Sequence, residues 1–422
     1  MRTYLPTIII VLINLLLDLY VFKGIRILIK KRIIRKTPKI SIYISYWFIS
    51  FLYLFSFLVL LPDTREIDSR QEYHKIFTFI GLWALVFIPK IAFTIFHFIE
   101  DISELIKRLV QKIRNIGNVS TDELPKISRT KFISQIGIVF ASIHFFSILY
   151  AITKGRSNYK IKNQNLFFNN LPSNFDGLKI VQISDFHIGS FFGSPDEVEK
   201  AVNIINAQNP DLILFTGDMV NNFANEMEEF IDILQTLEAK YGKYAILGNH
   251  DYGNYIDWKS SDEKNQNQKD LVDNFKKINF NLLLNQNDTI KIYDQEISII
   301  GVENWGLPPF PQYGNLKKAV EDVEPDNFKI LLSHDPTHWD EQVVSKTNID
   351  LTLSGHTHGM QMGIDVLGIK WSPVKFIYKR WSGLYNEKNQ YLYVNIGLGF
   401  IAFPGRIGML PEITVVELHT KV

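Results

Sequence analysis

Apolar residues are concentrated in the first third of the chain. Up to residue 151 they form four nearly continuous runs, at about 4–22, 40–61, 76–98 and 132–151. Each run is long enough for a helix to cross the hydrocarbon core of a bilayer, which is about 30 Å thick. Helices of a soluble bundle alternate apolar and polar faces, and these runs do not. Residues 1–151 are therefore predicted to be an all-α transmembrane domain with four helices.

Lysine and arginine residues between the runs predict how these spans are oriented. Residues 23–39 contain eight and residues 99–131 contain seven, and with four spans both segments lie on the same side. The other side carries eight in total, four of them in the tail after the fourth span. Because cationic loops are retained in the cytoplasm, we expect the protein in the cytoplasmic (inner) membrane, with the soluble part on the extracytoplasmic side.

Two polar features interrupt this region. Asp18 and Lys90 lie inside the first and third runs at similar depth. Since an unpaired charge inside a bilayer is costly, we expect them to form an ion pair, with snorkelling of Lys90 as the alternative. Residues 99–116 have apolar positions at helical spacing with charges between them, which predicts an amphipathic helix on the membrane surface. A solvated connector is the alternative for that segment.

Beyond residue 151 the pattern changes to short apolar runs that end in polar residues. We expect a linker at 152–175 and a soluble domain at 176–422. Helical stretches at 195–208, 225–240 and 266–278 separate several of the runs, and alternating strands and helices predict an α/β fold. Eight runs are predicted to be buried strands: 178–187, 211–218, 243–251, 297–304, 328–335, 351–358, 391–399 and 412–418.

Candidate chemistry lies where these strands end. In open α/β sheets, ligands bind beyond the carboxyl ends of the strands, so polar residues from five strands are expected to converge. His356 and His358 would point the same way if their segment is extended, and Asp185 and His187 share that spacing. The converging residues are Asp185, His187, Asp218, Asn249, His250, His334, His356 and His358.

These residue types are typical of a site for two metal ions. The chain has no cysteine, so any metal must be held by imidazole, carboxylate or amide groups, which suit Mn²⁺, Fe or Zn²⁺ alike. Two such ions bind the oxygens of a phosphoester and lower the pKa of a water held between them toward neutrality. The sequence therefore predicts a dimetal hydrolase acting on phosphorylated substrates.

The motif order D-x-H, G-D, G-N-H-D, H and G-H-x-H resembles that of the calcineurin-like metallophosphoesterase superfamily over about 180–420. The resemblance is closest to its membrane-tethered bacterial branch, through LGNHDYG, SGHTHGxQ and the segment NIGLGFIAFPGRIGMLPEI. It implies a two-sheet β-sandwich flanked by helices. It also implies that Asp185, His187, Asp218 and His358 hold one metal, and that Asp218, Asn249, His334 and His356 hold the second.

The same resemblance assigns two further roles. His250 would lie near the leaving group, as general acid or charge stabiliser, with Asp251 orienting its imidazole. Met360 departs from the branch, which commonly has glycine at that position.

Residues around the predicted site suggest the substrate. Arg406 is a candidate phosphate ligand, with a structural ion pair as the alternative. Residues 305–314 are aromatic and proline-rich and are candidates for a wall of the pocket. Residues 369–381 interleave cations with aromatic rings, which fits lipid headgroups at a membrane interface. A plain twisted hairpin is the alternative for that stretch.

We therefore expect a membrane-anchored phosphohydrolase that cleaves a phosphoester or pyrophosphate bond of a lipid, lipid-linked or nucleotide-type substrate. A phosphodiesterase or nuclease acting on a soluble substrate and a non-catalytic scaffold of the same fold are the alternatives. The lipid bilayer is an expected partner. The formal net charge of +1 gives no general attraction to nucleic acid, and none is expected as a partner.

Overall fold

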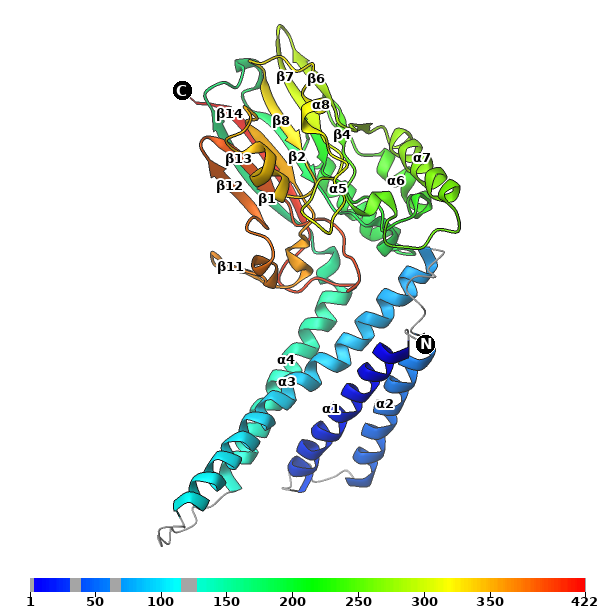
Figure 1. The fold of residues 1–422 in the computed structure, drawn as a ribbon, viewed down its shortest axis with the longest axis vertical. Helices are drawn as coiled ribbons and strands as arrows, with labels where there is room; N and C mark the ends of the chain where they lie inside the picture. The colour runs from blue at the N-terminus through cyan, green and yellow to red at the C-terminus, as the bar shows by residue number, and fades with distance from the viewer. Residues whose placement is uncertain (1–3, 31–38, 61–69, 115–126, 422) are drawn as a thin grey trace. The chain divides into compact units, whose positions relative to one another are not determined.

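Four long helices precede a domain of strands and shorter helices in the computed structural model, which describes residues 4–30, 39–60, 70–114 and 127–421 (Figure 1). The chain divides into two compact units. The helical unit contains residues 1–63 and 78–150, and the α/β unit contains residues 64–77 and 151–422. Each unit is described by itself below.

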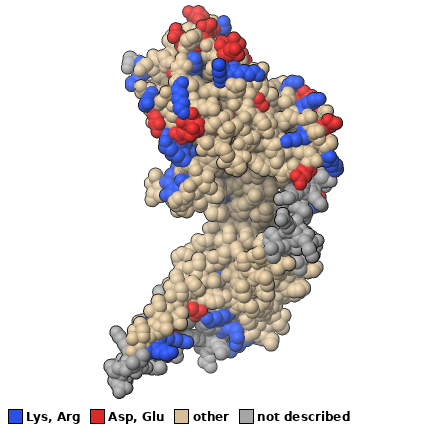
Figure 2. Space-filling model, viewed as in Figure 1, with Lys and Arg blue, Asp and Glu red and all other residues tan. Residues whose placement is uncertain are grey.

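The helical unit confirms the prediction of four helices. All four contain stretches long and apolar enough to cross a membrane, and most of their apolar side chains are not covered by protein, so the surface in Figure 2 is mostly tan over this unit. A helix covered in apolar side chains is stable in lipid rather than in water. The helices are α1 (Tyr4–Lys30), α2 (Lys39–Leu60), α3 (Arg70–Arg114) and α4 (Ile127–Thr153).

The amphipathic helix expected at 99–116 is not a separate element. Its residues up to Arg114 continue α3, which is 45 residues long without a break, and residues 115 and 116 lie outside the described part of the chain. The charged residues among 99–114 include Asp101, whose carboxylate accepts hydrogen bonds from Lys23 and Tyr20 of α1. The apolar and charged positions that predicted a separate amphipathic helix therefore belong to a polar extension of α3.

The expected ion pair between Asp18 and Lys90 is present. Lys90 Nζ lies 2.5 Å from Asp18 Oδ1, and both side chains are largely buried. The hydroxyl of Tyr46 donates to the same carboxylate oxygen at 2.9 Å, and the ring of Tyr53 lies 4.8 Å from the ammonium group. A buried pair supported in this way is costly to break from one side, because the remaining charge is left without a partner.

We predict that Lys90→Met destabilises the purified full-length protein in detergent by about 3 kcal/mol, because Asp18 then loses its counter-ion. The thermal unfolding midpoint measures this change. The double variant Asp18→Asn with Lys90→Met should recover most of the loss. Lys107→Met, which changes a 52 % exposed lysine of the same helix, is the control and should leave the midpoint unchanged. A double variant no more stable than the single one would contradict the pairing.

Two six-stranded mixed sheets form the centre of the α/β unit (Figure 1). In sheet order the first contains β1 (Lys160–Phe168), β14 (Glu412–Thr420), β2 (Leu178–Ile183), β3 (Leu212–Phe215), β4 (Lys243–Ala245) and β5 (Asn281–Leu282). The second contains β12 (Gly383–Glu387), β13 (Gln390–Val394), β9 (Leu351–Ser354), β8 (Phe328–Leu332), β7 (Gln295–Gly301) and β6 (Gln286–Ile292). A separate hairpin is formed by β10 (Ile364–Val366) and β11 (Ile369–Trp371).

Alternating residues of the central strands divide between two kinds of core. Ile180 and Ile297 belong to the layer between the two sheets, whereas their neighbours on the other face pack under helices. Val181 contacts the layer under α5 (Pro195–Asn206), α6 (Ile231–Gln235) and α7 (Ser261–Lys277). Ile300 packs under α8 (Leu316–Ala319). The result is a β-sandwich flanked by helices, which confirms the expected fold class.

The linker expected at 152–175 is mostly ordered structure of the α/β unit. Its central part is β1, which pairs in parallel with β14 from Lys160 opposite Glu412 to Phe168 opposite Thr420. Only Leu166 and Phe168 of this strand are buried. An edge strand with polar residues at its other positions carries little of the hydrophobic signal that marks a strand in sequence, which explains the error.

The first turns of α3 belong to the α/β unit. The Tyr73 hydroxyl is hydrogen-bonded to the side-chain amide of Asn222, and its ring lies 6.1 Å from that of Phe223. Tyr73 and Phe77 are both buried. This part of α3 therefore packs on the loop that follows β3, which also takes part in the site described next.

Candidate metal centre

The candidate ligands follow the carboxyl ends of five strands from both sheets. Asp185 and His187 follow β2, Asp218 follows β3, and Asn249 follows β4 of the first sheet. In the second sheet, His334 follows β8, and His356 and His358 follow β9. Strands β2, β3 and β4 run parallel to one another, as do β8 and β9, so each sheet delivers its polar loops to one edge.

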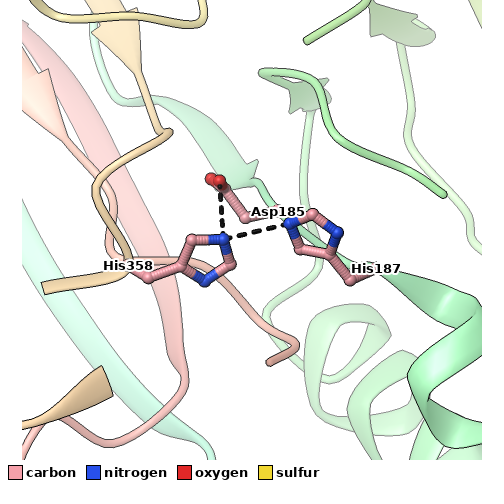
Figure 3. A group of neighbouring side chains, drawn as sticks. All are labelled: Asp185, His187 and His358. Atoms are coloured by element: carbon pink, nitrogen blue, oxygen red, sulfur yellow. Dashed lines mark hydrogen bonds and ion pairs between the residues drawn. The ribbon is translucent and has the colours of Figure 1, made fainter. Parts of the chain in front are cut away.

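One group of side chains consists of Asp185, His187 and His358 (Figure 3). Nε2 of His187 lies 3.0 Å from Nε2 of His358. The same atom of His358 lies 3.2 Å from Asp185 Oδ1. All three residues are buried, so the two imidazoles and the carboxylate direct their ligand atoms to a common point shielded from water.

A second group is formed by Asp218, Asn249, His334 and His356. Nε2 of His334 lies 3.2 Å from Asp218 Oδ2 and 3.1 Å from Asn249 Oδ1. His356 contributes Nδ1, which lies 2.8 Å from Asn249 Oδ1 and 3.3 Å from His334 Nε2. Two imidazoles, a carboxylate and an amide oxygen therefore converge on a second point.

Asp218 connects the two groups. Its Oδ2 atom, which faces His334 in the second group, also lies 3.6 Å from His187 Nε2 of the first. Its Oδ1 atom accepts a hydrogen bond from the backbone N–H of His250 at 2.8 Å, which fixes the carboxylate in this orientation. One carboxylate oxygen is thus shared by two clusters of metal-type ligands.

Most of these residues adopt a left-handed backbone conformation. The φ angles of Asp185, His187, Asp218, His356 and His358 are 50°, 46°, 60°, 74° and 50°. The condition under which the paired residues would point the same way, an extended segment, is therefore not met, and they turn toward the site because β2 and β9 each end in a tight, strained turn. Non-glycine residues in this region are uncommon and cluster at functional sites. A side chain at Gly248 would also collide with the Asp218 carboxylate.

His250 lies beside both groups, and its surroundings differ from the expectation. Asp251 is not hydrogen-bonded to the imidazole; its carboxylate accepts hydrogen bonds from the backbone N–H groups of Asp218, Met219, Val220 and Gly248. Nδ1 of His250 instead faces the backbone carbonyl of Asn221 at 2.9 Å. The predicted role of Asp251 as the orienting group is thus corrected, since it holds the loop after β3 against the loop after β4.

Aromatic residues that the motifs did not reveal surround the histidines. The ring of Tyr255 stacks on that of His250 at 4.3 Å, and its hydroxyl accepts from Asn249 at 2.7 Å. The Tyr378 hydroxyl lies 2.8 Å from His356 Nε2, with Asp335 Oδ2 at 3.5 Å. From the segment expected to wall the pocket, Phe310 packs edge-on against His356 at 4.6 Å. Such partners turn the other nitrogen of His356 toward the second group.

Burial and neighbouring charges set the protonation of the cluster. Burial lowers the pKa of His187 to about 3 and that of His356 to about 4, and burial raises the pKa of Asp185 to about 6. Burial alone would also raise the pKa of Asp218, but the imidazoles of His334, His250 and His187 together outweigh it and hold that pKa well below its usual range. Neutral imidazoles are the form that binds metal ions, as His187 and His356 already are. Burial opposes protonation of His334, but the Asp218 carboxylate raises the pKa of that imidazole to about 10, so His334 must lose a proton when a metal ion binds.

The donor set fits divalent metal ions. Imidazole nitrogens, carboxylate oxygens and one amide oxygen lie within reach of two points, and each point receives atoms from both sheets. Nitrogen and oxygen donors of this kind suit Mn²⁺, Fe or Zn²⁺. Because both ligand groups share an oxygen of Asp218, the site suits two adjacent ions better than two ions at separate sites.

Arg406 is not available to a phosphate. The residue is fully buried, and its guanidinium donates to the backbone carbonyls of Gly399, Ile396 and Met409 at 2.7, 2.8 and 3.3 Å. It also contacts the carbonyl and Nδ1 of His358 at 3.4 and 3.3 Å. The predicted role as a phosphate ligand is therefore wrong: Arg406 holds together the loops that present His358.

Comparisons with known protein families divide the chain into a helical part and a catalytic part, close to the boundary near residue 150 that the structure shows. Residues 1–156 match the family described as "Probable Calcineurin-like phosphoesterase, transmembrane domain". Residues 178–360 match the family described as "Calcineurin-like phosphoesterase". The second match contains all the residues of both ligand groups.

Several curated proteins are similar to this chain. "Uncharacterized metallophosphoesterase YkuE" of Bacillus subtilis (strain 168) is 33% identical over 256 residues, 59% of this chain and 82% of that protein. "Uncharacterized metallophosphoesterase Cj0846" of Campylobacter jejuni is 26% identical over 411 residues, 96% of this chain and 97% of that protein. "UDP-2,3-diacylglucosamine pyrophosphatase LpxG" of Chlamydia trachomatis is 30% identical over 285 residues, 54% of this chain and 81% of that protein.

Proposed function

Since this chain belongs to the calcineurin-like metallophosphoesterase family and has a membrane-spanning domain, we propose that it is a dimetal hydrolase that cleaves phosphoester or pyrophosphate bonds of lipid, lipid-linked or nucleotide-type substrates. The observation that carries this proposal is the carboxylate of Asp218, whose Oδ2 atom faces His187 on one side and His334 on the other. Two ligand groups that share one oxygen suit two adjacent cations.

The proposed ligands of the first metal are Asp185, His187, Asp218 and His358. Those of the second are Asp218, Asn249, His334 and His356. When bound, the two cations would neutralise the charge of a phosphate group and lower the pKa of water to give a nucleophile near neutral pH. The protein holds the ligand atoms in place in advance through strained turns and through hydrogen bonds such as that from the His356 N–H to Asp185 at 3.0 Å.

His250 is proposed to act on the leaving group. Its Nδ1 faces the Asn221 carbonyl, so a proton assigned to Nδ1 is held there and Nε2 is left to face a substrate. With both nitrogens protonated, Nε2 would donate to the departing oxygen as a general acid or stabilise its charge. Stacking on Tyr255 keeps the ring in this orientation.

We predict that His250→Ala lowers kcat by about 10²–10⁴-fold, the range usual for a lost general acid. Bound metal, measured by elemental analysis, should stay near the wild-type level, because His250 is not among the proposed ligands. His419→Ala serves as the control, since His419 lies at the end of β14 and contacts Asp176 and Glu417 rather than the cluster. Full activity in His250→Ala would rule out the assigned role.

The lipid or lipid-linked part of the proposal is supported by two observations. A chain anchored in a bilayer meets substrates that share that bilayer. The similar protein of Chlamydia trachomatis is named as a pyrophosphatase of UDP-2,3-diacylglucosamine, a substrate that carries acyl chains and a pyrophosphate. Charges of both signs are interspersed on the face of the α/β unit drawn in Figure 2, a distribution unlike the basic stripe typical of nucleic-acid binding.

A substrate panel tests the proposed function. Purified full-length protein with Mn²⁺ would be assayed against a phosphomonoester, a phosphodiester and a lipid-linked pyrophosphate. Hydrolysis that requires the metal supports the proposal, and preference for the lipid-linked pyrophosphate supports its narrower form. Preference for the diester would favour a soluble-substrate phosphodiesterase, and no hydrolysis of any member would contradict an enzymatic role.

We also propose that the protein lies in the cytoplasmic membrane with its α/β unit on the extracytoplasmic side. The excess of lysine and arginine in residues 23–39 and 99–131 supports this orientation. A reporter that is active on only one side of the membrane, fused to the C-terminus, tests it. Activity of a cytosol-specific reporter would overturn the orientation and leave the proposed chemistry unaffected.

A further inference from the structure

The β10–β11 hairpin and the turn after it carry a large exposed apolar surface. We call residues 360–377 the apolar hairpin; they comprise β10, β11 and a 3₁₀ turn at Pro373–Phe376. Leu367 at its tip is 97% exposed, and Phe376, Ile377 and Ile369 are 77%, 67% and 65% exposed. In Figure 1 the hairpin, labelled β11, stands apart from both six-stranded sheets. Contiguous exposed apolar surface of this kind marks an interaction site.

The pairing of the two strands makes this hairpin amphipathic. Ile364 pairs with Trp371 and Val366 pairs with Ile369, so all four side chains share one face, and all four are exposed. Asp365 and Lys370 form the pair between them and point to the opposite face. There, Asp365 accepts a salt bridge from Lys162 of β1 at 2.9 Å. The polar face is thus turned to the protein and the apolar face is turned outward, the reverse of a soluble hairpin.

Met360 adds an apolar side chain at the cost of backbone strain. It has a φ of 54° and is 49% exposed, at the position where glycine is the residue of least strain. In water, neither the exposed thioether chain nor the left-handed backbone is favourable. Contact with hydrocarbon would make the side chain favourable.

Cations accompany the apolar side chains. Residues 360–381 contain Lys370, Lys375, Lys379 and Arg380 but only one carboxylate, that of Asp365. Lys375 Nζ lies 5.3 Å from the ring centre of Phe376 and 6.0 Å from that of Trp371. Aromatic rings beside ammonium groups are typical of the headgroup level of a membrane, where the rings rest among the acyl chains and the charges meet lipid phosphates.

The apolar hairpin connects the candidate metal centre to the end of a membrane-spanning helix. On one side, Tyr378 follows it directly and contacts His356 at 2.8 Å. On the other side, the Gly363 N–H donates to Ile407 and the Gln361 amide donates to Gly405. Gly405 packs so closely on the backbone of Ala151 that a side chain there would collide with it. Ala151 lies at the end of α4, inside the candidate span 133–153.

We propose that the apolar hairpin inserts into the interface of an anionic lipid bilayer and presents phosphorylated lipid headgroups to the metal centre. The inference rests on the proposed function and narrows its substrate class to lipids that reach the site from the bilayer. The amphipathic pairing, the excess of cations and the connection to Ala151 each favour a lipid surface as the occupant.

A label at the tip tests insertion independently of activity. Because the chain has no cysteine, Leu367→Cys gives one labelling site for an environment-sensitive fluorophore. Tyr293→Cys is the matched control: it is also a turn residue, with a φ of 57° against 51° for Leu367, and is 92% exposed. In vesicles of phosphatidylcholine and phosphatidylglycerol, we expect brominated lipids to quench the label at 367 and aqueous iodide to quench the label at 293.

Equal quenching of both labels by iodide would overturn the proposal. Protection of the label at 367 from both quenchers, increasing with protein density, would indicate a second copy of the chain on this surface and would also overturn it. Neither result depends on hydrolysis, so neither bears on the proposed function.

A kinetic experiment separates the two proposals. Leu367→Glu with Phe376→Glu should lower kcat/KM for a lipid-linked pyrophosphate in vesicles about tenfold or more, because membrane binding scales with buried apolar area. Its activity on a soluble phosphomonoester should match that of Tyr293→Glu and wild type. Equal activity of all three proteins on both substrates would contradict the hairpin proposal alone, whereas a wild type inactive on every substrate would contradict the proposed function.

Discussion

Replacing Asp218 by asparagine is expected to lower kcat/KM for any hydrolysed phosphoester about 10³-fold or more, since a ligand shared by two cations contributes several kcal/mol and about 1.4 kcal/mol corresponds to tenfold. The change is nearly isosteric, and the asparagine oxygen still accepts the hydrogen bond from the His250 N–H that Asp218 Oδ1 accepts at 2.8 Å. The fold should therefore persist while the negative charge between His187 and His334 is lost.

Two measurements accompany this variant. Elemental analysis should find fewer bound divalent ions than in wild type, and brief treatment with a chelator should abolish wild-type activity until Mn²⁺ is restored. Asp273→Asn is the control, because Asp273 lies on α7 with its side chain 61% exposed and should retain both metal and activity. Wild-type metal content with wild-type turnover in Asp218→Asn would show that this carboxylate does not join the two groups.

Replacing Arg406 by methionine is expected to destabilise the protein by about 3 kcal/mol or more, because several buried backbone carbonyls lose their donor at once. In thermal unfolding of the full-length protein this corresponds to a fall of roughly 10 °C in the midpoint. Burial lowers the pKa of Arg406 to about 10, so the guanidinium stays charged at neutral pH, and its hydrogen bonds are those of a charged donor.

An arginine that is only partly buried, Arg156, provides the comparison for this prediction. Arg156→Met removes a partly exposed ion pair with Glu197, which is worth less than about 1 kcal/mol, so its unfolding midpoint should change little. If Arg406→Met unfolded at the wild-type temperature and only raised KM, Arg406 would be a substrate ligand, contrary to its burial.

The strands that the sequence pattern predicted are the interior strands of the two sheets. All eight expected strands are present, as β2, β3, β4, β7, β8, β9, β13 and β14. The missed strands of the sandwich are its four edges, β1, β5, β6 and β12. Interior strands are buried on both faces and appear as continuous apolar runs, whereas edge strands carry polar residues and are short or irregular. A strand that is buried on only one side therefore lacks the continuous apolar run that marks a strand in the sequence.

A similar limit applies to the site. The motifs identified the residues that converge, because each follows an interior strand and the ends of such strands meet. They did not reveal which neighbour each polar side chain contacts: Asp251 binds backbone N–H groups, and Arg406 binds backbone carbonyls. Those partners are main-chain atoms. Since almost every residue type carries the same main-chain groups, the sequence does not indicate which residue makes the contact. The left-handed turns were missed for the same reason, since aspartate and histidine do not mark such turns as glycine does.

The contact between Tyr73 and Asn222 has a practical consequence. Asn222 follows Asn221, whose carbonyl faces His250, and Tyr73 comes from the first turns of α3, far from the rest of the α/β unit in the sequence. The hydrolase is therefore assembled from two separate stretches of polypeptide, and no single cut releases it whole. A fragment that begins after α4 would lack Tyr73, which covers Asn222 and Phe223 close to His250. Turnover measured on such a fragment would therefore not represent the full-length protein.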